Sequence, residues 1–132
     1  MFIDANVFIM AYLNSQERGK RARAFLAKIA RGEQNAITSA LVLNEVFNTM
    51  LDLKGMGKVE SAHRNLQSYA HLTIMPIDVK VAGESLAYMK EGLETSDAFH
   101  AATMKIAGVG TICSFDRDFD RLKAKGIKRQ EP

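Results

Sequence analysis

The sequence predicts an α/β fold, with a mainly parallel central sheet flanked by helices on both faces. Short apolar runs alternate with longer amphipathic segments along the chain. Glycines, and Pro76 as the one proline before the C-terminal residue, lie between these segments, where turns are expected. Strands that alternate with helices pair in parallel, because right-handed crossovers return each helix onto the sheet. With 132 residues, 47% of them hydrophobic, the chain is expected to form one domain over residues 1–132.

The first half of the chain opens with a short apolar strand that ends at Asp4. Its clearest helix covers residues 20–31, where apolar residues recur at helical spacing and Gly32 follows as the stop. Ser39 is a suitable N-cap for a further helix that Gly55 ends. In order, the predicted elements are 1–4 (strand), 6–13 (helix), 20–31 (helix), 36–38 (strand), 39–54 (helix) and 58–70 (helix).

The second half repeats the alternation. Residues 72–77 are β-like, and Pro76 is tolerated because it lies near the end of the strand. Asp78 is a suitable cap for the next helix, and Thr95 or Ser96 for the one after it. The remaining elements are expected at 78–90 (helix), 95–107 (helix), 110–115 (strand), 118–125 (short helix) and 127–129 (strand).

Four carboxylates, Asp4, Glu45, Asp97 and Asp116, lie in separate apolar stretches. Burying a carboxylate is costly without a partner, so a shared pocket around a divalent cation is the simplest explanation. Asp4 and Asp116 end predicted strands, Asp97 lies in the first turn of a helix, and Glu45 lies about two turns into its helix. Because ligands of parallel sheets bind beyond the carboxyl ends of the strands, we expect these acids at one sheet edge.

The donor types favour Mg²⁺ or Mn²⁺, which prefer carboxylate oxygens. The three histidines, His63, His71 and His100, lack the paired spacing of a zinc site, and His100 is assigned to packing or the surface rather than to general-base chemistry. Such an ion activates water and orients a phosphodiester. Neither a P-loop nor a Gly-x-Ser-x-Gly elbow is present, so a metal-dependent hydrolase is the first hypothesis.

The charge balance suits a polyanionic substrate. The chain carries 18 basic and 15 acidic residues, so committing four acids to a metal pocket leaves the remainder with a surplus of seven positive charges. Cys113 is the only cysteine, which rules out an internal disulfide and favours the cytoplasm. No apolar run approaches the roughly 18 residues of a membrane span, so no membrane partner is expected.

The acids and their surroundings resemble the PIN domain, the nuclease fold of VapC-type toxins. Asp4-Ala5-Asn6 after an apolar strand is similar to the family's Asp-x-Asn opening. The other matching segments are Thr38–Val46, Ser96–Ala102 and Ile112–Phe119. The resemblance implies that Asp4, Glu45, Asp97 and Asp116 are catalytic and bind Mg²⁺ or Mn²⁺, with Asn6 and Ser114 as polar support.

The assignment of the fourth acid remains open. Asp118 and Asp120 lie close to Asp116, so either is an alternative ligand or a supporting residue. Asp116 is equally well placed to cap the short helix that follows it.

The resemblance also implies a function. The chain is expected to be an endoribonuclease that hydrolyses RNA and the toxin of a type II toxin–antitoxin pair, with a cognate antitoxin and a homodimeric state. The alternatives are an RNA-processing or DNA-directed PIN nuclease that is not a toxin, and a non-catalytic RNA- or protein-binding module. For the dimer, the expected contacts are the first helix and residues 58–70. The first helix is apolar on more than one side, which indicates either deep burial or a dimer contact: Phe8, Met10, Tyr12 and Leu13.

Overall fold

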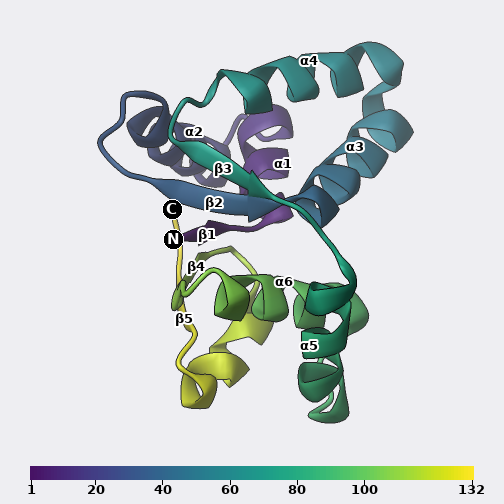
Figure 1. Cartoon of the computed structure of the whole chain (residues 1–132). Coiled ribbons are helices and arrows are strands. Elements are labelled where there is room, and N and C mark those ends of the chain that lie inside the picture. The colour runs from purple at the N-terminus through teal and green to yellow at the C-terminus, as the bar shows by residue number, and fades with distance from the viewer.

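The computed structural model describes residues 1–132 and contains one five-stranded parallel sheet in the order β3-β2-β1-β4-β5 (Figure 1). Every neighbouring pair of strands is parallel, which confirms the predicted fold class. The chain proceeds from β1 to β2 and β3 on one side, and then returns to place β4 and β5 on the other side of β1. The strands are β1 (Phe2–Ile3), β2 (Ala36–Ser39), β3 (Leu72–Met75), β4 (Thr111–Cys113) and β5 (Lys128–Gln130).

Helices cover both faces of the sheet. Figure 1 shows α1 to α4 on one face, and α5, α6 and the 3₁₀ helix η1 on the other. The reversal of strand order between β1 and β4 is a topological switch point, where the loops after adjacent strands diverge and leave room for a ligand. The helices are α1 (Ala5–Leu13), α2 (Glu17–Ala30), α3 (Ala40–Lys54), α4 (Met56–Ser68), α5 (Val79–Lys90), α6 (Thr95–Ile106) and η1 (Arg117–Lys125).

Local capping explains where several of these helices begin. Ser39 Oγ accepts a hydrogen bond from the Val42 amide at 3.3 Å, and Asp78 Oδ1 accepts one from the Val81 amide at 2.9 Å, as the sequence predicted. The predicted cap of α6 is wrong. Glu94 occupies the cap position without a side-chain bond, because the helical hydrogen bonds already begin at its carbonyl, which accepts from the Ala98 amide at 2.9 Å.

The first helix is partly covered from within the chain. It packs against α2 and α3, and both Val7 and Phe8 are fully buried in a cluster of 27 core residues. Of the residues behind the dimer prediction, Phe8 is deeply buried and Met10, Tyr12 and Leu13 are half-buried, so a dimer contact at α1 stays a prediction. The large apolar side chains that are exposed lie on other elements. Those exposed side chains are Leu51, Leu53, Met56, Ile74, Val79, Leu86 and Met89.

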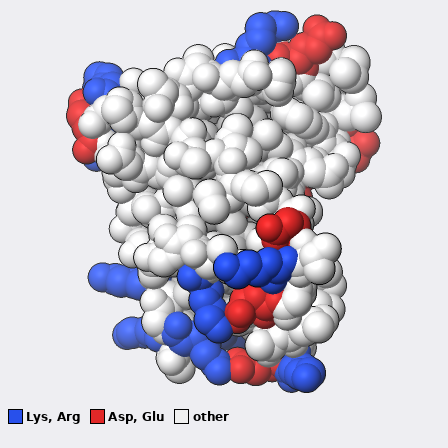
Figure 2. Space-filling model, in the orientation of Figure 1, with Lys and Arg blue, Asp and Glu red and all other residues white.

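The surface charges do not form a uniform basic face in the view of Figure 2. Lys, Arg, Asp and Glu side chains are mixed in the lower half, over the region of α5, α6 and η1. Two lysines there are paired with glutamates: Lys105 with Glu84, and Lys125 with Glu91. No helix has both the length and the apolar character that a membrane crossing requires.

Candidate metal centre

Asp4 lies at the switch point, directly between β1 and α1, and is only 6% exposed. Its Oδ1 accepts a hydrogen bond from the Ala5 amide at 2.7 Å and caps α1. Its Oδ2 accepts from Ser114 Oγ at 2.6 Å and from Asn6 Nδ2 at 2.5 Å. These donors come from α1 and from the end of β4, so the orientation of the carboxylate is set on both sides of the switch point.

Ser114 is the centre of this polar network and is fully buried. Its hydroxyl donates to Asp4 and accepts from Asn6 Nδ2 and from the Asp116 amide, each at 2.9 Å. One donor and two acceptor positions are all that a serine hydroxyl has, so its hydrogen-bonding capacity is full. Asn6 Oδ1 also accepts from the Phe115 amide at 3.1 Å, which ties the β4–η1 loop to α1.

Glu45 reaches the same place from α3. Its Oε2 lies 3.2 Å from Nε2 of His100 on α6. One potential ligand atom from each of Asp4, Glu45 and His100 lies within 4.8 Å of the others. A carboxylate only accepts hydrogen bonds, so the His100–Glu45 contact places a proton on Nε2.

His100 is the residue that sequence reasoning underestimated. The prediction left a surface position open for His100, and this is wrong, because the residue is only 2% exposed. Its ring lies 5.4 Å from that of Phe2, centroid to centroid. Its Nδ1 is buried without a partner. The available signal was its spacing, because a residue three positions after Asp97 shares one side of a helix with it.

Asp97 lies half-buried in the first turn of α6. Burial is the main cause that raises its pKa, to about 6, and the charges of Asp4, Asp116 and Glu94 raise it further, while His100 lowers it. Asp97 is therefore within the electrostatic reach of both strand-end acids, at the same edge of the sheet.

The pKa values of Asp4 and His100 report the same crowding. Burial raises the pKa of Asp4 and the charge of Glu45 adds to it, against the lowering effects of His100 and Ser114. Burial disfavours the charged form of His100, but the hydrogen bond to Glu45 and the surrounding carboxylates raise its pKa overall. The imidazole of His100 is thus a positive group that favours the charged forms of both Asp4 and Asp97.

The acids after β4 occupy different environments. Asp116 is exposed and caps η1, with Oδ1 accepting from the Asp118 amide at 2.9 Å, so the capping alternative describes its local role. The side chain of Asp118 is 65% exposed. Asp120 is paired with Arg129 at 2.8 Å, and this contact lowers its pKa. Of these three acids, Asp116 is the one whose charge acts on Asp97.

The donor set fits a hard divalent cation. Carboxylate oxygens predominate, and a bound divalent ion would favour the charged forms of Asp4 and Asp97, which burial and then the neighbouring carboxylates disfavour. The chain thus contains a candidate acidic metal site.

A family model described as the PIN domain matches residues 1–125 of this sequence. The chain belongs to the PIN domain family. Its relatives include Ribonuclease VapC46 of Mycobacterium tuberculosis (strain ATCC 25618 / H37Rv), which is 32% identical over 105 residues, covering 77% of this chain and 78% of the relative. The chain is therefore a VapC-like PIN protein.

Solved structures share its fold. Mycobacterium tuberculosis VapC20, described as a Sarcin-Ricin loop cleaving toxin, superposes with a TM-score of 0.79 at 17% identity, covering 99% of this PIN chain and 98% of its own. A toxin–antitoxin complex from Klebsiella pneumoniae gives a TM-score of 0.70 at 19% identity, with coverages of 99% and 98%. VapBC2 from Rickettsia felis, bound to a promoter DNA fragment, gives 0.69 at 16% identity, with coverages of 98% and 96%.

Proposed function

We propose that this PIN protein is a metal-dependent endoribonuclease and the toxin of a toxin–antitoxin pair. The observation that carries the proposal is that ligand atoms of Asp4, Glu45 and His100 lie within 4.8 Å of one another at the switch point. Asp97 interacts electrostatically with two of these residues, Asp4 and His100. A relative named as a ribonuclease supports the choice of RNA phosphodiester hydrolysis among metal-dependent reactions.

In this proposal Asp4, Asp97 and Asp116 hold Mg²⁺ or Mn²⁺, with Glu45 beside them. The bound ion would lower the pKa of water and offset the charge that develops on the phosphate. The chain's own contribution is orientation. Asn6 and Ser114 fix the Asp4 carboxylate through Oδ2. His100 holds Oε2 of Glu45, which leaves Oε1 free to accept a hydrogen bond from water.

The partner proposals rest on different support. Structural relatives include a toxin–antitoxin complex, which supports a cognate antitoxin for this chain. A homodimer is proposed with α1 and residues 58–70 as its expected contacts, because packing against α2 and α3 leaves Met10, Tyr12 and Leu13 half-buried. The presence of every acid of the predicted quartet favours a nuclease over a non-catalytic module of the same fold.

The test is RNA cleavage by the purified chain with Mg²⁺, with Mn²⁺ and with EDTA. We expect cleavage with either ion, none with EDTA, and a loss of more than roughly 100-fold in Asp4→Asn, which keeps the size of the side chain but removes the charge and one of the two accepting oxygens. Asp118→Asn is the matched control, since that side chain is exposed and outside the buried network. Metal-independent cleavage, or full activity in Asp4→Asn, would refute the proposed site.

The toxin role needs a cellular measurement. Induced expression of the wild-type chain should arrest growth of a bacterial host, and Asp4→Asn at equal abundance should not. Unimpaired growth with an enzyme that is active in vitro would favour the RNA-processing alternative.

A further inference from the structure

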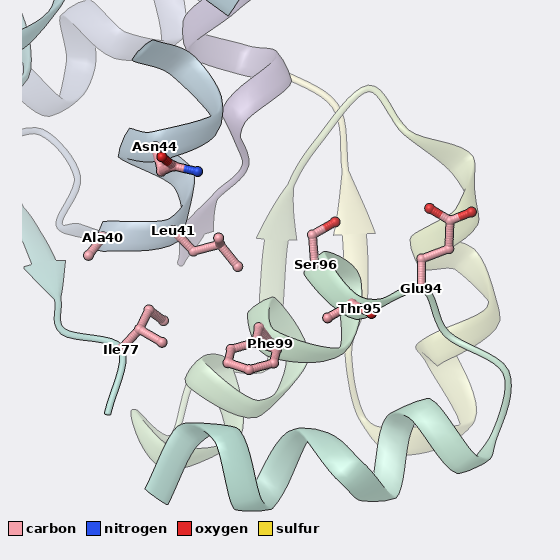
Figure 3. Close-up of a pocket in the computed structure, with 8 residues that line it drawn as sticks. All are labelled: Ala40, Leu41, Asn44, Ile77, Glu94, Thr95, Ser96 and Phe99. Atoms are coloured by element: carbon pink, nitrogen blue, oxygen red, sulfur yellow. The ribbon is translucent and has the colours of Figure 1, made fainter. Parts of the chain in front are cut away.

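A groove lies between the start of α3, the segment after β3 and the start of α6 (Figure 3). Its volume is about 840 Å³, within the range of sites that hold small organic groups. Its lining includes Leu41, Asn44, Ile77, Glu94, Ser96 and Phe99. The acidic cluster described above does not include any of them.

The walls of this groove are apolar and include an aromatic ring. Leu41, Ile77 and Phe99 are half-buried, and Figure 3 shows their side chains directed toward a common space. A flat heterocycle is stabilised by stacking on an aromatic side chain, and unpaired RNA bases are commonly bound in this way.

The rim of the groove offers hydrogen-bonding groups. The side chains of Asn44, Ser96 and Glu94 make no hydrogen bond or ion pair within the chain, so their donors and acceptors are available to a ligand. Glu94 is the only charged residue of the lining, and its carboxylate disfavours a phosphate there. The groove therefore suits a neutral group with polar edges, as a nucleobase is.

The groove is continuous with the acidic cluster along two helices. On α3, Leu41 lies one turn before Glu45, on the same side of the helix. On α6, Ser96 directly precedes Asp97. Glu94 lines the groove and also acts electrostatically on Asp97, so the two sites are neighbours in space as well as in sequence. A substrate whose phosphate lies at the acids can extend its adjoining nucleotide into the groove.

We propose that this groove binds one unpaired RNA base next to the cleaved phosphodiester bond and thereby selects which bond is cut. The proposal rests on the ribonuclease function proposed above. Phe99 stacks on the base, while Asn44 and Glu94 contact its polar edge. A base within a duplex has that edge occupied by its partner, so the groove also selects for single-stranded RNA.

The experiment combines protein variants with a modified substrate. Cleavage sites are first mapped for the wild type on a single-stranded RNA oligonucleotide of mixed sequence with Mg²⁺. The preferred site is then resynthesised with an abasic ribose on its 5′ or its 3′ side. Phe99→Leu keeps an apolar side chain but removes the ring, and Phe47→Leu makes the same change on α3 at a half-buried position outside the groove.

We expect Phe99→Leu to lower kcat/KM on the intact RNA by roughly tenfold, and one of the abasic substitutions to lower the wild-type value similarly. Combining Phe99→Leu with that abasic substrate should cause little further loss, because the same contact is already absent. Asn44→Asp should redistribute the cleavage sites, and Phe47→Leu should change neither quantity. The proposal would be overturned if the losses in kcat/KM from Phe99→Leu and from the abasic substrate multiplied fully when combined, or if the groove variants cut like the wild type. Either result would favour a protein partner for the groove.

A second measurement separates this inference from the proposed activity. The four ribonucleoside 5′-monophosphates are titrated into the wild type with Mg²⁺, and the side-chain amide of Asn44 is followed by NMR. Shifts that persist in Phe47→Leu and disappear in Phe99→Leu support the groove even if the wild type cleaves no RNA, in which case only the proposed activity fails. An unperturbed Asn44 amide would overturn the base site.

Discussion

The acids at the switch point and the acids of the segment after β4 are chemically alike but physically different. Asp4 and Asp97 have raised pKa values, chiefly because they are buried and then because they face other carboxylates. Asp120 has a lowered pKa, because Arg129 holds both of its oxygens. In the first group the effect of burial and of neighbouring carboxylates outweighs the lowering effect of His100, whereas the arginine partner of Asp120 outweighs its desolvation.

This difference distinguishes the acids that a bound cation would stabilise. A surface carboxylate that is paired with arginine already has a positive partner, and such a pair contributes little to stability. Carboxylates that are crowded and desolvated raise the free energy of the metal-free protein, and a divalent ion lowers it again. The predictions below test whether this contrast in environment corresponds to a contrast in function.

The largest expected effect is that of Asp97→Asn. RNA cleavage should fall by more than roughly 100-fold, because a charged oxygen that helps to hold the ion is lost. The metal-free protein should melt at the same temperature or slightly higher, since one repulsive charge has gone. Cleavage assays at matched Mg²⁺ and salt, with melting curves in EDTA, provide the measurement; near wild-type cleavage would show that Asp97 is dispensable.

His100→Gln should have a smaller but diagnostic effect. Gln can still donate to Glu45 but cannot become charged, so cleavage should fall by roughly tenfold. Because His100 lowers the pKa of Asp97, its replacement should also move the midpoint of the pH–rate profile upward. A uniform rate loss with an unmoved midpoint would reduce His100 to a packing residue.

Ser114→Ala should weaken the network that orients Asp4. The substitution removes the donor to Asp4 and leaves the Asp116 amide without its acceptor, while the Asn6 amide keeps only its bond to Asp4 Oδ2. We expect a loss of about 1–3 kcal/mol in the free energy of unfolding and weaker Mg²⁺ binding. Denaturant unfolding measures the change in stability, and a Mg²⁺ titration of cleavage measures the change in binding. The control is Ser68→Ala, which makes the same substitution at an exposed position at the end of α4. Ser114→Thr is not a suitable control, because Ser114 is fully buried and has no room for a further methyl group.

The pH dependence of stability follows from the raised pKa of Asp97. Its folded pKa of about 6 exceeds the ordinary value of 3.8, so the folded chain binds this proton more tightly than the unfolded chain does. Without metal, stability should therefore fall as the pH rises from about 4 to about 6 and change little from this group above that. Saturating Mn²⁺ should reverse the trend. Melting temperatures in EDTA and in Mn²⁺ across this window are the measurement, and parallel curves would contradict the shared site.

The smallest effect is expected for Asp120→Asn. The Arg129 pair lies at the surface and Arg129 also contacts Glu131 and the Ser114 carbonyl, so stability should change little and cleavage should be unchanged. Cleavage with Mg²⁺ is measured for Asp120→Asn and Asp97→Asn under the same conditions. A large loss in Asp120→Asn would assign Asp120 to the metal site and contradict the difference between the two groups of acids.

The alternation of strands and helices was available from the sequence because periodicity and capping act within a turn or two of the chain. Ser39 and Asp78 cap their helices as their positions indicated, and Asp4 lies at the end of its strand. The acids could also be recognised from the sequence, because a carboxylate in an apolar run is costly to bury without a partner.

Tertiary structure alone decided which groups meet. Glu45 and His100 are 55 residues apart, and nothing local to either indicates the 3.2 Å contact between them. Likewise, only the fold shows that Arg129 pairs with Asp120 and that α2 and α3 pack against α1. Secondary structure follows from interactions between residues that are close in sequence. The partner of a buried charge depends instead on how distant segments pack, and the residues around that charge in the sequence do not indicate it.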